Sequence, residues 1–589
     1  MKKKIVFIVV YCLFCISVSQ KTLVAQDVAE EAPKQFFMAR VNSNMPCGAI
    51  ETKNISHPAA AFSRSNAFTL KEHPEYINSQ TDAFRPAFMQ ETQIFTPFDR
   101  VSIPLILAEH YFNDSFKWIA SQQIQKRGIF SGLWKSYRFN TRHKYPEELR
   151  YLVDFQRTWT YDDALGVYAE LKRAKRYELE GNRALYAEAM GNAVRGIEGL
   201  FRLAKWEEEE NSFDGLWHFS YNTNSDSFID PRGPIGANLW ALNAILSYTI
   251  QTGDTKYLEW VRTKIQTFLF QQQVTDKNDP RYGLIQAGLL NATDYAYGNM
   301  MGYSIREGNT NVQNQNCHIE HNADYIATLR LAAIAERRFN KYPDQRYLSE
   351  LRRRHEICIK AVISKFWRGD HFCTALDAHV LPDGTLTAVL NESVAVDNNS
   401  WVGDVIMSYD MELAWKCLQY NKKNFMRKAR VNIQDRKENW HEVEVEGLFF
   451  FDKDFIDPYV CGLTSQERDV FERMIQPEAT FGYITLLIKY AQLTDYKDRR
   501  EECLSLIKRL YESMVIIKLA YVGDGTPYAT EFISQYFNTA ESMAGTATGA
   551  ITTCALFGVS LDDFVGATPP SDFLVDGKAP LFGVDIDSL

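Results

Sequence analysis

Six short runs of the chain combine acidic, amide or hydroxyl side chains with the start of an apolar, helix-like segment. Most of them also carry an aromatic residue, and they follow one another at intervals of roughly 60 to 85 residues. Carboxylates can act as general acids and bases, and together with amides they form hydrogen bonds to hydroxyl groups. The runs therefore predict one shared site that handles a hydroxyl-rich ligand. They are 159–164, 236–240, 319–324, 396–401, 477–482 and 538–543.

The predicted ligand-binding side chains come from all six runs. They are Trp159, Tyr161, Asp163, Asn238, Trp240, His321, Asn322, Asn398, Trp401, Phe481 and Glu541. A purely structural interpretation also exists, because Asp, Asn, Ser and Thr are preferred N-caps and an acid in the first turn offsets the helix dipole. Capping, however, does not require Trp159, Trp240 or Trp401 beside the polar residues.

Paired helices must position these runs. Four pairs show an apolar helix, a short polar break and a second helix with one charged face, which predicts an inner and an outer layer. The pairs are 164–172 with 182–204, 237–252 with 255–270, 322–339 with 344–367, and 479–493 with 498–514. If the inner helices run parallel, their starts meet at one mouth of a ring. Alternating residues at 372–389 and 441–451 predict small β-ribbons, and the acidic run Glu207–Glu210 reads as a solvated loop.

Four of these runs resemble sequence motifs of a known family. Tyr161-Asp162-Asp163-Ala164-Leu165, Glu320-His321-Asn322-Ala323-Asp324, Val396-Asp397-Asn398-Asn399-Ser400-Trp401 and Glu478-Ala479-Thr480 are similar to motifs of the six-hairpin glycosidase superfamily. The resemblance covers residues 98–565 and implies an all-α fold, an (α/α)6 toroid of six helical hairpins with small β-ribbon insertions. Members are mostly inverting glycoside hydrolases, with some phosphorylases, uronyl hydrolases and lyases.

Glycoside hydrolysis by inversion needs a protonated carboxylic acid and a carboxylate base. Glu478 suits the acid, because the apolar helix around it would raise its pKa. Asp162 suits a base or a ligand to a sugar hydroxyl, and Asp397 and Glu320 are the next catalytic candidates. We expect a carbohydrate substrate or ligand and no cofactor.

Cys317, His318 and His321 also raise the possibility of zinc. A zinc site usually needs three or four ligands, and the chain has no HExxH motif and no paired CxxC, so we expect no metal. The two histidines leave a sugar epimerase as an alternative, because epimerases on a similar toroid use two histidines for proton transfer.

The N-terminus predicts export. Lys2–Lys4 precede an apolar run, 5–18, that is shorter than the about 20 residues of a membrane span, so we interpret residues 1–26 as a signal peptide. An uncleaved anchor is the alternative. The mature chain is then periplasmic or extracellular, without an integral membrane segment. It would comprise an extended arm (27–97), the toroid (98–565) and a tail (566–589).

Composition narrows the function classes further. The net charge is −9 and is spread along the chain without a basic stripe, which argues against nucleic-acid binding. We therefore predict an exported inverting glycoside hydrolase that acts on a poly- or oligosaccharide in a pocket at one mouth of the ring. The alternatives are a non-catalytic glycan-binding or envelope-assembly toroid and, third, a uronyl hydrolase, lyase or epimerase.

Overall fold

The computed structural model describes most of the region beyond residue 104. The described residues are 9–11, 14–16, 105–138, 156–210, 217–225, 227–230, 233–291, 311–381, 383, 385–434, 439–450, 465–521, 523–531, 539–570 and 573. Within these ranges no helix has the length and apolar character needed to cross a membrane. The predicted arm at 27–97 and most of the predicted signal peptide lie outside them.

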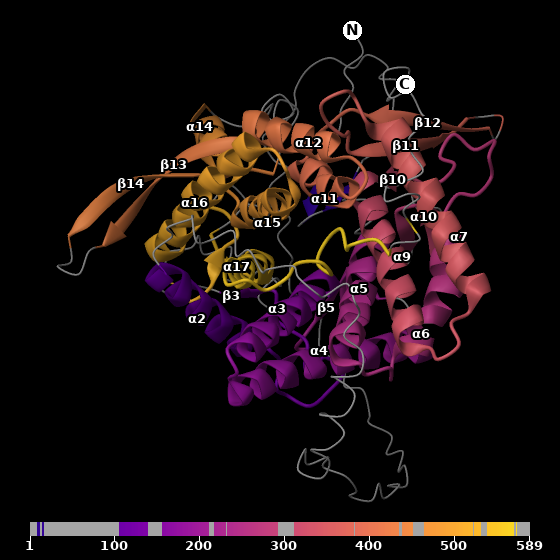
Figure 1. The fold of residues 1–589 in the computed structure, drawn as a ribbon, viewed down its shortest axis with the longest axis horizontal. Helices are drawn as coiled ribbons and strands as arrows, with labels where there is room; N and C mark the ends of the chain where they lie inside the picture. Colours follow the sequence, from indigo (N-terminus) through magenta and orange to yellow (C-terminus); the bar gives the residue numbers. More distant parts are fainter. Residues whose placement is uncertain are drawn as a thin grey trace, which may run out of the picture. The chain divides into compact units, whose positions relative to one another are not determined.

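Six helices form a closed inner ring (Figure 1). Each packs on the next around the ring, and the last packs on the first. The helices are buried nearly all round, including charged side chains such as Lys172, Arg330 and Lys489. They are α3 (Thr160–Leu179), α5 (Ile235–Thr252), α9 (Ile319–Phe339), α11 (Val396–Met407), α15 (Pro477–Leu493) and α17 (Met543–Leu556). The predicted (α/α)6 toroid is confirmed, and each inner helix begins within or next to one of the six runs.

A second layer of helices surrounds the ring. The outer helices are α4 (Arg183–Glu210), α6 (Leu258–Lys264) with its continuation through η5 (Ile265–Leu269) and α7 (Phe270–Gln272), α10 (Gln345–Phe366), α12 (Met411–Asn424), α16 (Lys497–Ala520) and α2 (Leu105–Gln122). Five of them follow their inner partner in sequence, whereas α2 packs on α17 and closes the ring between distant parts of the chain. A further short helix, α14 (Ser465–Arg473), precedes α15. All four predicted helix pairs are present.

The turns between paired helices have ordinary local causes. Gly253 ends α5 in the left-handed conformation (φ 77°), which glycine adopts without strain. Asp344 and Asp410 cap α10 and α12, each accepting two backbone N–H groups with its side chain. These turns bring the chain back from the inner to the outer layer.

Short antiparallel sheets surround the starts of the inner helices. Strands β4 (Arg157–Trp159), β7 (Gly233–Pro234), β10 (Cys317–His318) and β16 (Glu541–Ser542) each lead directly into an inner helix. Their sheet partners are β5 (Ser220–Asn222) and β6 (Ser227–Asp230), β8 (Gly288–Asn291) and β9 (Asn311–Asn314), β11 (Ala375–Val380) and β12 (Leu386–Asn391), and β3 (Tyr137–Arg138) and β15 (Thr526–Pro527). The predicted ribbon at 372–389 is the β11–β12 hairpin. These sheets surround the starts of four of the six inner helices, α3, α5, α9 and α17.

A longer ribbon stands apart from this set. It pairs β13 (Met426–Gln434) with β14 (Trp440–Leu448), and it projects from the toroid (Figure 1). The ribbon predicted at 441–451 is therefore present, and its first strand lies before the predicted range. Near the N-terminus β1 (Val9–Tyr11) pairs antiparallel with β2 (Phe14–Ile16).

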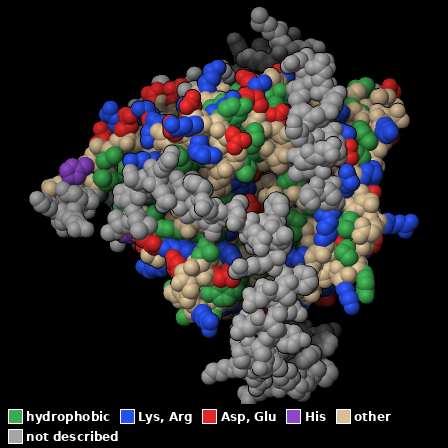
Figure 2. Space-filling view, in the orientation of Figure 1, with side chains coloured by type: hydrophobic (Ala, Val, Ile, Leu, Met, Phe, Trp, Pro, Cys, Tyr) green, Lys and Arg blue, Asp and Glu red, His purple; other side chains and the backbone are tan. Residues whose placement is uncertain are grey.

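The surface and the thiols match the composition. Lys and Arg side chains are interspersed with Asp and Glu on the face drawn in Figure 2. The six described cysteines of the toroid, Cys317, Cys358, Cys373, Cys417, Cys503 and Cys554, are buried free thiols.

One sequence expectation is wrong: Glu207 is not solvated but fully buried at the end of α4, where it pairs with His218 (2.6 Å) and accepts the Tyr221 hydroxyl (2.5 Å).

The chain beyond α17 crosses the interior of the ring as the yellow trace in Figure 1. We call residues 560–567 the C-terminal segment. Three buried cations bind its carbonyl oxygens: Lys172 reaches Ser560 O (2.8 Å), Lys489 reaches Phe564 O (2.6 Å) and Arg330 reaches Ala567 O (2.8 Å). All three cations lie in the C-terminal half or middle of their helices. The segment therefore fills the end of the ring away from the helix starts, and the packed core continues past residue 565.

Candidate functional site

The fourth residue of every inner helix has the same structural role. Each of these six side chains, which we call the staple residues, accepts one backbone N–H from the connection that follows an outer helix. The pairs of staple residue and backbone donor are Asp163 with Trp134 N (2.7 Å), Asn238 with Trp217 N (2.8 Å), Asn322 with Ile285 N (2.9 Å), Asn399 with Phe372 N (3.0 Å), Thr480 with Leu448 N (2.8 Å), and Thr546 with Thr526 N (2.8 Å). A buried backbone N–H needs such an acceptor. The staple residues therefore tie each incoming connection to the ring.

This role corrects part of the predicted ligand-binding set. Asp163, Asn238 and Asn322 use their polar atoms within the fold. Asn238 Nδ2 also donates to two backbone carbonyls, and Asn322 Nδ2 donates to His318 O (2.7 Å). Asn398 is likewise engaged, with its amide 2.7 Å from Thr374 Oγ1. We assign these four side chains to holding the connections and not to the ligand.

The second residue of the inner helices behaves differently. Tyr161, Glu320, Asp397 and Glu478 occupy this position in α3, α9, α11 and α15. Burial raises the pKa of the Tyr161 hydroxyl, and the charges on Glu478, Asp397 and Asp162 raise it further. Because three separate helices contribute these groups, the interaction shows that their second residues converge inside the mouth. Asp162, the third residue of α3, joins the same cluster.

Asp162, Asp397 and Glu478 form what we call the acid cluster. All three are at most 3% exposed. Burial raises the pKa of Glu478 well above its usual range, and the charges of Asp397 and Asp162 raise it further, against one hydrogen bond from Tyr161 Oη (3.0 Å). Burial also raises the pKa of Asp397 well above normal and that of Asp162 to about 7, the latter held down by a hydrogen bond with Ser136.

Each member of the acid cluster also has an unsatisfied oxygen. Within the described part of the chain, Asp162 Oδ1, Asp397 Oδ2 and Glu478 Oε2 are buried and have no hydrogen-bond partner. Buried polar atoms in native proteins are nearly always paired, so an orphan needs a reason. Three orphans from three helices in one cluster indicate a place where a ligand supplies the partners.

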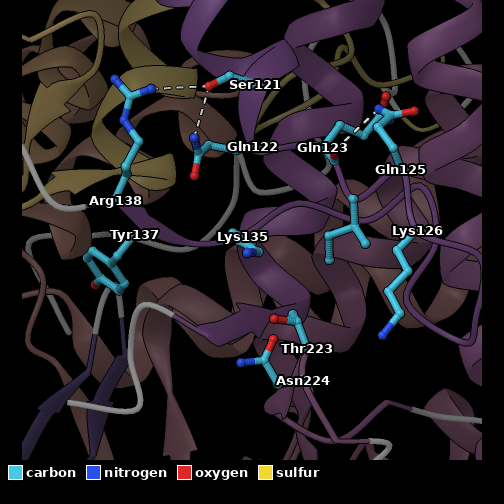
Figure 3. Close-up of a pocket in the computed structure, with 11 residues that line it drawn as sticks. Ser121, Gln122, Gln123, Gln125, Lys126, Lys135, Tyr137, Arg138, Thr223 and Asn224 are labelled. Atoms are coloured by element: carbon cyan, nitrogen blue, oxygen red, sulfur yellow. Dashed lines mark hydrogen bonds between the residues drawn. The ribbon is translucent and has the colours of Figure 1, made fainter. Parts of the chain in front are cut away.

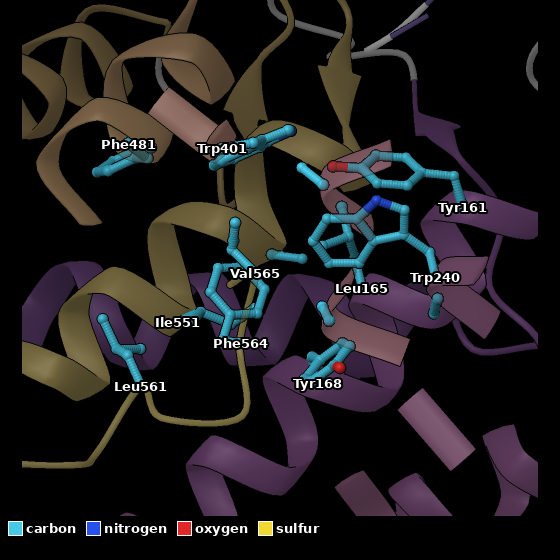
Figure 4. Packing of buried hydrophobic residues seen from close by; sticks show 14 of the residues in the cluster. Tyr161, Leu165, Tyr168, Trp240, Trp401, Phe481, Ile551, Leu561, Phe564 and Val565 are labelled. Atoms are coloured by element: carbon cyan, nitrogen blue, oxygen red, sulfur yellow. The ribbon is translucent and has the colours of Figure 1, made fainter. Parts of the chain in front are cut away.

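Tyr161, Trp240 and Trp401 lie close together (Figure 4), and the Tyr161 hydroxyl bonds Glu478 of the acid cluster. The Trp240 ring meets Tyr161 edge-on (centroids 5.2 Å apart) and lies 6.3 Å from Trp401. Trp401 packs against Gly482, where a Cβ would come within 2.7 Å of the indole, so only glycine allows this approach. A hydrogen bond joins Trp240 to Asp324, a side chain one turn below the mouth. Both indoles are buried, with 3% of each exposed, and Trp240 also packs against Phe564 of the C-terminal segment (5.7 Å).

Two predicted aromatic ligands are placed differently. Phe481 points between the helix layers, with its ring 5.6 Å from Tyr111 and 6.4 Å from Tyr511, so it belongs to the core and not to the site. Trp159 is buried on Phe219 (4.4 Å, edge to face), and the Arg157 guanidinium lies 4.6 Å above its ring.

A histidine pair lies at the start of α9. The His318 and His321 rings are 5.1 Å apart, and His321 Nε2 is 3.8 Å from Glu320 Oε1. Burial lowers the pKa of His318 to about 4, and it lowers that of His321 well below normal with a further contribution from His318. Both rings are therefore neutral near pH 7 and can exchange a proton with a ligand.

Glu541 is saturated by the fold. Its carboxylate accepts Arg138 Nε (2.7 Å), Trp118 Nε1 (2.8 Å) and Gly525 N (3.2 Å). It therefore braces β3 and α2 against α17, and we assign it to the fold instead of to the ligand. No described group of three His, Cys, Asp or Glu side chains has the arrangement of a metal site.

Sequence reasoning missed Ser136, whereas it predicts Asp324 as a supporting partner one turn inside its helix. Ser136 bonds the Asp162 carboxyl, yet it lies in an irregular loop with no motif around it. Asp324 holds the Trp240 indole. Its place in run 319–324 was a usable signal, because it lies one turn below Glu320 on the same helix.

Comparison with known proteins gives matches in structure only. Neither a protein-family model nor a curated protein sequence matches the chain. The similar solved structures include the following three. A D-mannose isomerase has TM-score 0.48 and 12% identity over 77% of this chain and 97% of its own. A family 76 glycoside hydrolase from a bovine Bacteroides thetaiotaomicron strain has TM-score 0.46 and 10% identity over 77% of this chain and 77% of its own. The cellobiose 2-epimerase of Spirochaeta thermophila has TM-score 0.44 and 11% identity over 79% of this chain and 99% of its own.

Proposed function

We propose that the protein is a glycoside hydrolase whose active site is the acid cluster at the mouth of the toroid. One observation carries this proposal: three carboxyl groups from three helices converge beside Trp240 and Trp401, and each keeps an oxygen without a described partner. Unpaired buried carboxyl groups weaken a fold. Their presence together is accounted for if a substrate completes them.

The environments of the acids suggest separate roles. Glu478 combines burial with two neighbouring carboxylates, so it keeps its proton near neutral pH and can donate it to the glycosidic oxygen. Asp162, whose pKa is held to about 7 by Ser136, ionises more readily and can act as the base that activates water. Asp397 then accepts hydrogen bonds from sugar hydroxyls. With a separate acid and base we further propose inversion at the anomeric carbon.

A screen of poly- and oligosaccharides tests this proposal. Wild type is compared with Glu478→Gln and, as a matched control, with Glu501→Gln on the exposed side of α16. We expect turnover of at least one glycan, a loss of about 10³-fold or more in Glu478→Gln and no change in the control. NMR of the first-formed product then reports the anomeric outcome.

The result can also contradict the proposal. Full turnover in Glu478→Gln would remove Glu478 as the acid. Binding of glycans without any turnover would favour the non-catalytic toroid, in which the acid cluster only holds sugar hydroxyls.

The histidine pair favours a second candidate, a sugar epimerase. Two neutral imidazoles 5.1 Å apart beside Glu320 could remove and return a proton on opposite sides of a sugar carbon. Epimerisation in D₂O would place deuterium at the reacting carbon and would be lost in His321→Asn. A hydrolase leaves that carbon unlabelled.

We also propose export, on the basis of the basic and apolar N-terminal run. Mass spectrometry of the mature protein from cells that express the full chain tests this. A new N-terminus near residue 26 is expected, and an intact Met1 in the cytoplasm would contradict it.

A further inference from the structure

A second hollow lies outside the acid cluster. It has a volume of about 460 Å³ and is bounded by the end of α2, the connection 123–138 and the turn after β5 (Figure 3). Binding sites for small molecules typically measure about 300–1,000 Å³, while a water molecule needs only about 30 Å³. The hollow is therefore large enough for a sugar unit and much larger than an inorganic anion requires.

The lining of this hollow, which we call the rim pocket, is cationic. Lys126, Lys135 and Arg138 contribute to it, and none of its described lining residues is acidic. Arg138 is partly neutralised, because its Nε pairs with Glu541 behind the pocket wall while an NH group reaches Ser121 Oγ (3.3 Å). Neither lysine has an ion-pair partner in the described part of the structure. Two positive charges are thus available to a ligand.

The remaining lining suits a hydroxylated ligand. Gln122, Gln125 and Asn224 bring amides to the pocket, and Tyr137 brings an aromatic ring. Ser121 Oγ accepts from both Arg138 and Gln122, which holds this wall in place (Figure 3). Amides pair with hydroxyl groups as both donors and acceptors. The combination of charge, amides and ring fits an acidic sugar better than a bare ion.

One short stretch of chain separates the rim pocket from the acid cluster. In the connection 134–138, Trp134 N bonds Asp163, and Ser136 bonds Asp162 and Trp159 N (2.9 Å). The alternate residues Lys135 and Tyr137 line the rim pocket. This alternation places the pocket behind the connection 134–138, which contacts Asp162 through Ser136.

We propose that the rim pocket binds an acidic saccharide unit, one that carries a carboxylate or sulfate group, of a glycan bound by this protein. The proposal rests on the proposed function only in taking the ligand to be a saccharide. Lys126 and Lys135 hold the anionic group, and the amides hold the ring hydroxyls.

Calorimetric binding on the full chain tests this. The probes are oligogalacturonate with its carboxyl-reduced counterpart, and dextran sulfate oligosaccharide with dextran. The proteins are wild type, the double variant Lys126→Ala/Lys135→Ala and the control Lys497→Ala, whose side chain is 79% exposed on α16. A charge-assisted hydrogen bond contributes about 1.5–3 kcal/mol, which corresponds to about tenfold in affinity or more.

We expect at least one acidic probe to bind more tightly than its neutral counterpart. The double variant should lose about tenfold or more for that probe and nothing for the neutral one, and Lys497→Ala should bind as wild type does. The proposal is overturned if neither acidic probe binds, if the double variant binds it unchanged, or if acidic and neutral probes weaken equally. Binding of inorganic sulfate alone, with no acidic saccharide bound, would also overturn it.

The same experiment separates the two proposals. Binding at the rim pocket should persist in Glu478→Gln, because Glu478 is not among the residues that line it. Lysine-dependent binding without turnover of any glycan would refute only the hydrolase. Turnover that depends on Glu478, with acidic binding independent of the lysines, would refute only the rim pocket.

Discussion

The two ends of the ring treat buried charge in opposite ways. At the end filled by the C-terminal segment, Lys489 meets Asp404 (2.7 Å) and Phe564 O, and Arg330 meets Val405 O (3.0 Å) and Ala567 O. At the mouth, each carboxyl group of the acid cluster keeps an oxygen without a described partner. Both ends belong to the same six helices. The fold can therefore pair its buried polar groups, and at the mouth it leaves carboxyl oxygens without a described partner.

This difference distinguishes structural from functional polar residues within one helix turn. On α3, α11 and α15 the staple residue and the acid-cluster residue are only one or two positions apart, and aspartate occurs in both sets. The staple residues have their partners supplied by the connections, so their removal should lower stability. Each member of the acid cluster keeps one oxygen without a described partner, so its removal should lower activity instead.

The largest effect on stability should come from the closed end. Lys489→Met would leave Asp404 buried without its ion-pair partner, which typically costs about 3–5 kcal/mol in the free energy of unfolding. Urea denaturation measures this loss. The second change Asp404→Asn should recover part of it, because the unpaired charge is then gone. A loss below 1 kcal/mol in Lys489→Met would remove the contrast between the two ends.

A smaller loss is expected at a staple residue. Asn238→Ala leaves the buried Trp217 N without its acceptor and should cost about 1–3 kcal/mol of unfolding free energy, with little change in turnover per folded molecule. Thermal unfolding and turnover are measured on the same preparation. If turnover falls while stability is retained, Asn238 belongs to the ligand site and our reassignment is wrong.

The smallest effect is a pH dependence at the mouth. Burial raises the pKa of Asp162 to about 7, above its value in the unfolded chain, so the folded state holds this proton more tightly. Its contribution is complete below about pH 4 and is lost as pH rises towards 7, by at most about 1.4 kcal/mol per pH unit. Relative to wild type, Asp162→Asn should gain stability from pH 5 to pH 7. A constant difference across this range would contradict the raised pKa.

The sequence predicted the ring well because its signals are local. Apolar helices, a glycine such as Gly253 and a cap such as Asp344 act within a few residues, so the helices and the turns between them could be located. The roles within each start could not, since a staple residue such as Asn322 is recognised only by Ile285 N, which is far away in the chain. The same reason explains Phe481, whose partners Tyr111 and Tyr511 lie on two other helices.

Contacts between distant parts of the chain also explain what else the sequence did not predict. The run that begins at Glu207 reads as solvated, and only the fold brings His218 and Tyr221 against it. The rim pocket gave no sequence signal either, because Lys126, Arg138 and Asn224 are scattered residues that meet through tertiary structure.

The central claim is that the acid cluster serves function at the expense of stability. The most direct test is the unfolding free energy and glycan turnover of the double variant Asp397→Asn/Glu478→Gln, compared with wild type at pH 7. The account predicts a variant at least as stable as wild type and without turnover, because amides of the same shape replace two buried carboxyl groups that each keep an oxygen without a described partner. A variant that loses more than about 2 kcal/mol of stability, or that keeps its turnover, would contradict it.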